Sequence, residues 1–577
     1  MTDTPAALRF TEKMTGWFHL GATSFETGLV DGEADASPLT FVLTIDIPDV
    51  DAAIADPSLP APLHGYVEAP ALSPDRIDVP SGTFRLMVPE PDQVQASTMR
   101  YSMELVTTDR RRLQFDGHKN LHHDSILKMW PATTTLYVTI SESGIGIGRG
   151  IIIIKPLDFA RQLRTMRVTG VRGRRRRIAT LAAFGRGFFG RLTPLYAGEL
   201  ATAARFAPDA TPPDGRRATR LPVGAACWCD ASGAWLDGTS VGPDAWLKLT
   251  RYQGGTRGPL LLAAGFAMEA HSFATPTIST TLAEFAVERG YDVWLFDYRA
   301  SNALPTATSA FTIDEVAMAD WPAAVAEVRR RTGAHSVQVL GHCVGSLSIL
   351  MAVLGGLDGV RSIVCSQFTV HPATSRLNRT KNALHVGDAM RWLHLRTVAP
   401  NAKPTFTNKL MDRALVVLPV PKGERCGRPV CRWLNAIFGL THAHGQLNDA
   451  THESFDEAFG YANVKGLRHL SRISRSGAAV DAAGRDVYLP NVDRLAMPIL
   501  FVQGARNHIF RPAGTARTVA WLSEANDPSL YETLLLPEYA HLDAMVGKDA
   551  PTDVFPGIFA HLDRFNEGAG SDRPATV

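Results

Sequence analysis

The sequence predicts a two-domain chain, in which a β-rich domain over residues 1–158 precedes an α/β domain with a mostly parallel sheet over residues 221–577. Three observations predict this division. Short runs in the first third alternate apolar and polar side chains, as half-buried strands do. Continuous apolar runs after residue 258 are typical of parallel strands that helices cover on both faces. Residues 159–198 hold many arginines and no acidic residue, which indicates a basic connector over residues 159–220.

The β-rich domain is predicted from five alternating runs that turn residues separate at short spacing. Such runs indicate a sandwich or a partly closed sheet. They lie at residues 39–48, 82–88, 99–106, 133–140 and 150–154. The glycines of Gly144-Ile-Gly-Ile-Gly148 miss the GxGxxG register and no helix follows them, so we expect a hairpin turn and no dinucleotide cofactor.

The connector carries its arginines between Arg161 and Arg191, with apolar residues partly at helical spacing. One interpretation is a solvated linker or a helix packed on a neighbouring domain. The other is a patch that lies on anionic lipid, held by charge and by a buried apolar face. Residues 209–215 (DATPPDG) have the composition of a linker.

The α/β domain is predicted from strands that alternate with helical segments, which is the pattern of a parallel sheet. The alternation lapses between residues 372 and 490, and so long an insertion into a complete sheet indicates a lid. The expected strands are residues 259–264, 292–296, 336–340, 362–366, 498–503 and 530–536.

A nucleophile elbow is predicted at Gly341-His-Cys-Val-Gly345, where a strand turns sharply into an apolar helix. The pattern is GxSxG with Cys343 in place of serine. Small flanking residues let helix and strand approach, and the helix N-terminus supplies N–H groups to an oxyanion. We expect these donors to be the N–H of Val344 and that of Phe266 or Ala267, which follow the first strand of the sheet.

The remaining members of a catalytic triad are predicted after the last two strands. His541 is the expected general base, with His342 as the competing candidate. Asn507 occupies the position where such enzymes carry an acid, and an amide can orient an imidazole by accepting its ring N–H. The alternatives are Asp543 and an acid from the lid. A thiol tolerates this change better than a hydroxyl, since part of it is ionised near neutral pH.

Composition excludes several other classes of protein. The 577 residues hold 59 Lys+Arg against 57 Asp+Glu, so nucleic acid is not expected as a partner. The sequence has no apolar run of membrane-spanning length and no signal-like start, so we expect a cytoplasmic protein, with membrane association as the alternative. The cysteines and histidines between residues 426 and 452 match no standard zinc spacing, so we expect no metal and no cofactor.

The chain resembles the lipase-like α/β-hydrolase superfamily at several short motifs. They are Gly290-Tyr-Asp-Val-Trp-Leu-Phe-Asp-Tyr-Arg299, the Cys343 elbow, His541-Leu-Asp with Gly547-Lys-Asp-Ala, and Asp553-Val-Phe-Pro. More narrowly, it resembles the bacterial hydrolase module fused behind cholesterol-oxidase-like flavoenzymes of the glucose–methanol–choline group. The β-rich third is similar to the segment that links the two modules, and the flavin half is absent. The elbow also resembles that of polyhydroxyalkanoate synthases, which use Cys-His-Asp.

Together these observations predict a hydrolase of lipophilic esters or thioesters that works through a Cys343 acyl-enzyme and a Cys-His-Asn triad. Met268 and His342 are expected to contact the substrate, and the lipophilic preference rests on analogy with the fold. One alternative is a cysteine acyltransferase that moves an acyl group from a thioester to an alcohol. Another is a scaffold that kept the fold after its triad decayed.

Overall fold

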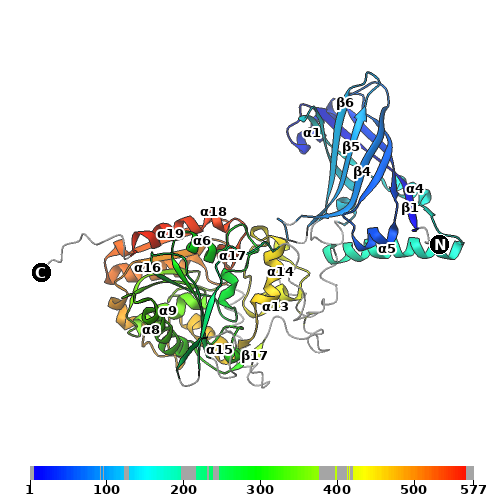
Figure 1. Ribbon diagram of the computed structural model, residues 1–577. Helices are drawn as coiled ribbons and strands as arrows, with labels where there is room; N and C mark the ends of the chain where they lie inside the picture. The colour runs from blue at the N-terminus through cyan, green and yellow to red at the C-terminus, as the bar shows by residue number, and fades with distance from the viewer. Residues whose placement is uncertain are drawn as a thin grey trace. The chain divides into compact units, whose positions relative to one another are not determined.

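The protein is described by a computed structural model that covers residues 5–90, 92–94, 96–121, 129–196, 216–230, 233–237, 246–375, 397–398, 412, 415 and 420–566. The chain divides into two compact units, Met1–Ala201 and Thr202–Val577 (Figure 1). Each unit has a hydrophobic core of its own, and each is described by itself.

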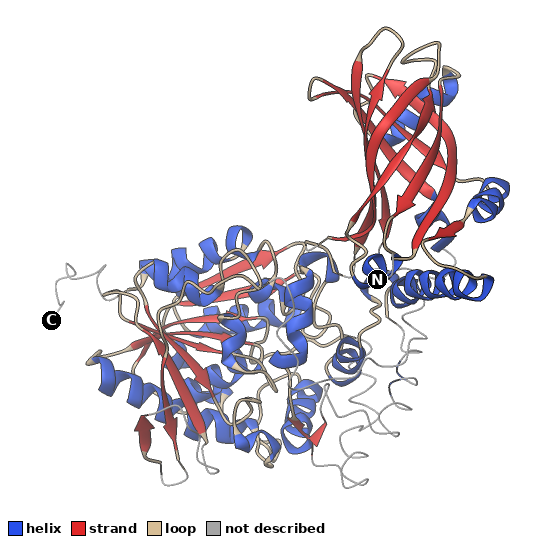
Figure 2. Cartoon of the chain, turned by 45° about the vertical axis from the view of Figure 1, so that its right-hand side comes forward, coloured by secondary structure: helices blue, strands red, loops and turns tan. Residues whose placement is uncertain are grey.

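The first unit is an antiparallel sheet of eight strands that closes on itself (Figure 2). Closure occurs because β1 pairs with β2 along one edge and with β8 along the other. Gly16 lies at this crossing, where a Cβ would stand 2.2 Å from the carbonyl oxygen of Ile151. The strands are β1 (Ala7–Leu20), β2 (Pro38–Ile47), β3 (Pro60–Glu68), β4 (Ile77–Pro89), β5 (Ser97–Val106), β6 (Arg112–Leu121), β7 (Thr135–Glu142) and β8 (Ile145–Ile153).

The β-rich character of this unit is confirmed, and the glycine-rich stretch is the hairpin between β7 and β8. Inward side chains alternate with outward ones, as in β2, where every second residue is buried. A buried polar group interrupts this apolar interior. Lys119 Nζ lies 2.9 Å from Glu12 Oε1, and the hydroxyl of Tyr101 donates to Glu12 Oε2 at 2.8 Å. Three short helices belong to the same unit: α1 (Phe25–Ala34), α2 (Val50–Ala55) and α3 (Met129–Thr134).

The described part of the basic segment, residues 159–196, belongs to the first unit. It forms α4 (Pro156–Thr165), β9 (Arg167–Thr169) and α5 (Arg174–Tyr196), and β9 pairs with β1. Phe184 and Leu192 of α5 pack into the core, whereas Ile178 and Phe189 are exposed, as are the arginines 174–177. The expected linker at residues 209–215 lies outside the described residues. In the described part of the chain, no helix combines the length and the apolarity needed to cross a bilayer.

The second unit is built on a nine-stranded sheet of order β11-β10-β12-β14-β13-β15-β16-β19-β20. The strands from β14 to β20 run parallel, and β10 to β12 form an antiparallel edge that the sequence analysis missed. The bounds are β10 (Ala225–Cys229), β11 (Trp235–Asp237), β12 (Leu247–Tyr252), β13 (Pro259–Ala263), β14 (Asp292–Asp297), β15 (Val337–His342), β16 (Val360–Ser366), β19 (Ile499–Gly504) and β20 (Tyr531–Leu536).

Helices cover both faces of this sheet (Figures 1 and 2). Helices α6 (Leu282–Glu288) and α19 (Phe555–Arg564) pack on one face, while α8 (Trp321–Thr332) and α9 (Val344–Leu354) pack on the other. The helices α16 (Pro512–Ala525), α17 (Asp543–Val546) and α18 (Ala550–Asp553) complete the C-terminal part. The parallel strands all have their carboxyl ends on the same side of the sheet. The segments that follow β13, β15, β19 and β20 therefore meet at this carboxyl edge.

The predicted lid insertion falls between β16 and β19, and much of its first half lies outside the described residues. Its described part contains α13 (Pro429–Ile437), α14 (Asp449–Ala458) and α15 (Val464–Ser476). The short strands β17 (Thr397–Val398) and β18 (Ala462–Asn463) pair within it. Met268, which follows β13, forms a β-bridge with Phe459 at the end of α14, so the lid is joined to the sheet edge.

Candidate active site

Cys343 occupies a strained turn between β15 and α9. Its backbone angles are φ 54° and ψ −119°, a region that non-glycine residues rarely adopt. The two flanking glycines allow the turn to pack closely. A Cβ on Gly341 would lie 2.6 Å from the backbone nitrogen of Ser346, and one on Gly345 would lie 2.6 Å from the carbonyl oxygen of Ala263. The elbow predicted from the sequence is therefore the conformation that this segment adopts.

Two backbone N–H groups converge on the Cys343 sulfur, those of Val344 and Phe266. They stabilise the thiolate, but the surrounding protein excludes water and raises the pKa of the thiol to about 12. The thiol is thus protonated at neutral pH, although part of its surface is open to a pocket. Phe266 and Ala267 were the two candidates for the second oxyanion donor beside Val344. The N–H of Phe266 is the one that contacts the sulfur. Ala267 is fully buried, with φ 61°.

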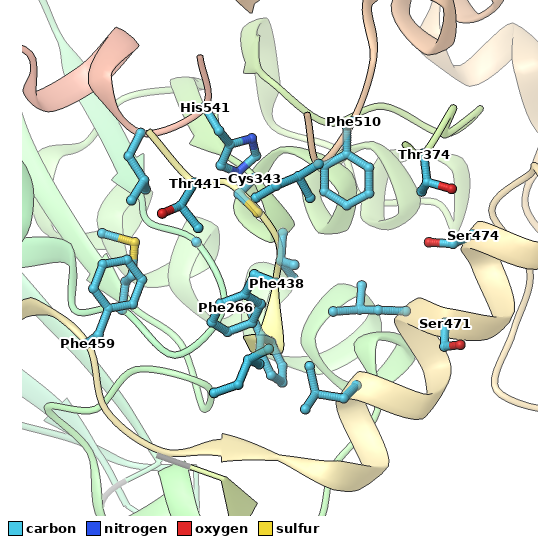
Figure 3. A pocket seen from close by; sticks show the side chains of 18 of the residues that line it. Phe266, Cys343, Thr374, Phe438, Thr441, Phe459, Ser471, Ser474, Phe510 and His541 are labelled. Carbon is cyan, nitrogen blue, oxygen red and sulfur yellow. The ribbon is translucent and has the colours of Figure 1, made fainter. Parts of the chain in front are cut away.

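His541 lies beside Cys343 at the edge of the same pocket (Figure 3). It follows β20 and is buried. Burial and the neighbouring His342 lower the pKa of His541 well below its usual value, so the ring is uncharged at neutral pH. An uncharged imidazole is able to accept a proton, provided that the nitrogen facing the nucleophile is the unprotonated one.

Asn507 contacts His541, but with the opposite end of its amide from the one expected. Its Oδ1 accepts the backbone N–H groups of Ile509 at 3.0 Å and Phe510 at 2.9 Å. Its Nδ2 donates to Gln367 Oε1 at 2.9 Å and lies 3.0 Å from His541 Nδ1. Because backbone N–H groups only donate, they fix the orientation of the amide. The expectation that Asn507 accepts the ring N–H is therefore wrong for this conformation.

The amide orientation determines the resting tautomer of His541. A ring nitrogen that faces an amide NH₂ must act as acceptor, so Nδ1 carries no proton and the neutral ring is protonated at Nε2. In Ser-His-Asp hydrolases the carboxylate holds the proton on Nδ1 and leaves Nε2 free to act as base. Asp543 does not replace this carboxylate, since its Oδ2 accepts the N–H of Ala540 and burial raises the pKa of Asp543 to about 7.

Among the two predicted substrate contacts, only Met268 lines the pocket. His342 is buried behind the elbow, where its Nδ1 lies 3.1 Å from Ser366 Oγ and its ring centroid lies 4.9 Å from that of His541. His342 is therefore not among the described residues that line this pocket. Gln367 was missed altogether. It follows β16 with φ 72°, and its position at a strand end was the one available signal.

The pocket beside Cys343 is a cavity of about 170 Å³ with mostly apolar walls (Figure 3). Within the described residues, no Asp, Glu, Lys or Arg lines it. Threonine and serine hydroxyls supply most of its polar side-chain groups. The apolar side chains come from the sheet edge and from the lid: Phe266, Met268, Ile437, Phe438, Phe459, Leu467, Leu470, Ile509, Phe510 and Leu542.

A second cluster of reactive side chains lies in the lid. The ligand atoms of Cys426, Cys431, His444 and His452 all lie within 4.8 Å of one another. These four residues fit a metal ion, although the sequence analysis expected none. The cluster is distinct from the Cys343 pocket.

The sequence profile of the α/β hydrolase fold family matches residues 258–548, half of the chain. The chain belongs to the α/β hydrolase fold family. This hydrolase is 22% identical over 332 residues to gastric triacylglycerol lipase of Rattus norvegicus. The aligned region covers 52% of this chain and 79% of that lipase. It is 22% identical over 328 residues to lipase member K of Mus musculus, with coverage of 52% and 79%.

Two solved structures show a weaker similarity to part of the chain. The Pyrococcus furiosus esterase Pf2001 superposes with a TM-score of 0.34 at 13% identity, over 63% of this chain and 97% of the esterase. A lipase in its open form superposes with a TM-score of 0.37 at 14% identity, over 59% of this chain and 97% of the lipase.

Proposed function

We propose that this hydrolase cleaves lipophilic esters or thioesters through an acyl-enzyme on Cys343. The observation that carries the proposal is the convergence of the Val344 and Phe266 N–H groups on the Cys343 sulfur, next to His541 and at the wall of an apolar pocket. Preorganised donors of this kind stabilise the oxyanion of acyl transfer. The family match and the two lipases support ester hydrolysis as the reaction class.

In the proposed reaction, Cys343 Sγ attacks the acyl carbonyl carbon while the thiol proton passes to His541 Nε2. The bond from this carbon to the leaving oxygen or sulfur then breaks, and the same proton passes to the leaving group. Water attacks the resulting thioester, gives a proton to Nε2 and releases the acid, and Cys343 recovers its proton. The N–H groups of Val344 and Phe266 stabilise the negative oxygen in both halves of the reaction.

Asn507 is a positioning residue in this scheme, and its resting orientation opposes the reaction. The thiol proton needs a free Nε2, so the amide has to turn and present Oδ1 to an Nδ1–H. Turning breaks the hydrogen bonds from Ile509 and Phe510. At about 0.5–1.5 kcal/mol each, their loss costs about 1–3 kcal/mol, which slows acylation roughly tenfold to a hundredfold.

The pocket supports a neutral, lipophilic acyl or alcohol portion as the substrate group. Its walls are largely aromatic and aliphatic side chains, so transfer of a hydrocarbon chain from water is favourable by about 25 cal/mol per Å² buried. A carboxylate or a phosphate in this cavity would lose hydration and find no side-chain cation among the described lining residues.

The test is intact-protein mass spectrometry after mixing the protein with p-nitrophenyl esters and acyl thioesters of graded chain length. We expect an acyl mass increment that maps to Cys343, absent from Cys343→Ala and slow to form in His541→Ala. The matched control is Cys227→Ala, which removes another buried cysteine and should keep the adduct. Absence of any adduct and of any turnover would overturn the proposal in favour of the scaffold.

Adding alcohols of graded chain length to the same mixtures identifies the acyl acceptor. Hydrolysis predicts that adduct decay depends on water alone. Decay that accelerates with alcohol, with appearance of the new ester, would instead assign the chain to acyl transfer between a thioester and an alcohol.

A further inference from the structure

The lid gathers two cysteines and two histidines around one buried point, away from Cys343. Cys426 precedes α13 and Cys431 lies in its first turn. His444 begins the short 3₁₀ helix His444–Gln446, and His452 lies in α14. The three cluster residues Cys426, Cys431 and His452 are buried, and His444 is largely covered. The fold therefore brings these four side chains together from separate segments of the lid.

The distances within the cluster are within about 0.5 Å of those in a tetrahedral metal site. His452 Nε2 lies 3.4 Å from Cys426 Sγ and 2.9 Å from Cys431 Sγ, and Cys431 Sγ lies 3.9 Å from His444 Nε2. Ligands bound to zinc at about 2.3 Å for sulfur and about 2.05 Å for nitrogen are separated by roughly 3.3–3.8 Å. Small side-chain rotations therefore place all four donor atoms on one ion.

The surroundings orient the two imidazoles toward this point. Glu424 Oε2 lies 2.9 Å from His444 Nδ1, which directs Nε2 to the cluster in the way that carboxylates orient metal-bound histidines. His452 Nδ1 is buried and finds no hydrogen-bond partner among the described residues. His452 therefore makes its polar contacts through Nε2, the atom that faces both sulfurs.

We propose that Cys426, Cys431, His444 and His452 bind one Zn²⁺ ion. Two thiolates and two imidazoles form the S₂N₂ donor set that tetrahedral zinc prefers. Four protein ligands leave no open position for water or substrate, so the ion is structural. Binding releases the two thiol protons, and it replaces weak thiol–imidazole contacts with metal bonds.

The ion would fix the lid segments that form one wall of the pocket. Helix α13 connects Cys431 to Ile437 and Phe438, which line the cavity, and α14 connects His452 to Phe459, which also lines it. Between the helices, the carbonyl of Thr441 accepts the N–H of Leu542, the residue after His541. This consequence rests on the proposed function of the pocket, whereas metal binding does not.

The test is the metal content of the full-length protein, expressed without an affinity tag and dialysed against metal-free buffer. Elemental mass spectrometry should find about one zinc per chain. Cys431→Ser and His452→Gln should lose it, while Cys227→Ser, which removes a buried cysteine outside the cluster, should keep it. A wild-type protein without bound metal overturns the proposal.

A second measurement uses the wild-type protein alone, so it does not depend on the folding of variants. Native protein should protect Cys426 and Cys431 from alkylation, and a strong chelator should expose both as free thiols. Recovery of a Cys426–Cys431 disulfide in place of two protected thiols overturns the proposal. If one zinc binds per chain but no adduct forms on Cys343, the metal site is supported and the proposed function alone fails.

Discussion

The side chain that most controls the candidate site is Asn507, because its amide end decides which nitrogen of His541 carries the proton. The backbone N–H groups of Ile509 and Phe510 hold Oδ1, so Nδ2 faces the ring. A carboxylate at the same position would accept from these N–H groups and from Nδ1–H together. In the proposed reaction this orientation keeps His541 in the tautomer whose Nε2 is unable to accept the thiol proton of Cys343.

We therefore predict that Asn507→Asp accelerates acylation of Cys343 by roughly tenfold to a hundredfold, the reverse of the cost of turning the amide. The pH profile distinguishes this effect from a change in packing. With a thiol pKa of about 12, wild-type alkylation at Cys343 should rise about tenfold per pH unit up to the highest testable pH. The carboxylate stabilises imidazolium beside thiolate, so the profile should move to lower pH.

The matched control is Asn507→Leu, which removes the hydrogen bonds from both ends of the amide and offers Nδ1–H no acceptor, so it should not reproduce the acceleration. A profile for Asn507→Asp that coincides with the wild-type one would show that Asn507 does not set the tautomer. Gln367 is able to adapt to the carboxylate, since its buried Nε2 has no partner among the described residues.

At the scale of elements, the elbow depends on how closely α9 approaches the strand β13. We predict that Gly345→Ala lowers the free energy of unfolding by about 1–3 kcal/mol, because its Cβ would lie 2.6 Å from the Ala263 carbonyl oxygen. It should also abolish the acyl adduct, since α9 carries the Val344 N–H. Thermal unfolding and the adduct assay measure the two effects.

The control is Gly185→Ala in α5, where a Cβ would meet no atom within 4 Å. Alanine is the better helix former by up to about 1 kcal/mol, so this variant should be neutral or more stable. Equal melting temperatures for Gly345→Ala and the wild type would contradict the packing argument.

Two of the strands that the sequence analysis missed differ from the predicted central strands in one physical respect. The central strands were predicted because helices cover both faces and leave continuous apolar runs. Strands β1 and β6 were missed because each places a charged residue, Glu12 or Lys119, at a buried position where the pattern requires an apolar one. The two charges are compatible only as a pair, and no local pattern contains both.

The same limit applies to the candidate sites. The motif placed Cys343, Val344, Phe266 and His541, since each follows a predicted strand at the same sheet edge. The amide orientation of Asn507 depends on N–H groups that its own loop supplies, and no motif encodes it. The lid cluster depends on tertiary contacts between separate segments of the lid, so ligand spacing along the chain did not reveal it.

At the scale of the whole molecule, the two units have separate cores, and we expect them to unfold as separate cooperative units. The buried pair in the first unit tests this expectation. In Glu12→Gln the ammonium of Lys119 stays buried, with side-chain exposure of 2%, but loses its charged partner. Breaking such a pair costs about 3–5 kcal/mol.

We predict that Glu12→Gln lowers the unfolding transition of the first unit alone, and leaves both the transition of the second unit and the acylation rate of Cys343 unchanged. Calorimetry with hydrogen exchange assigns each transition to its unit. The matched control is Glu104→Gln, which breaks the exposed pair with Arg112 in the same sheet and should cost no more than about 1 kcal/mol. If Glu12→Gln instead moved both transitions together, the two units would be one cooperative structure, and the stability of the closed sheet would directly limit the lifetime of the pocket.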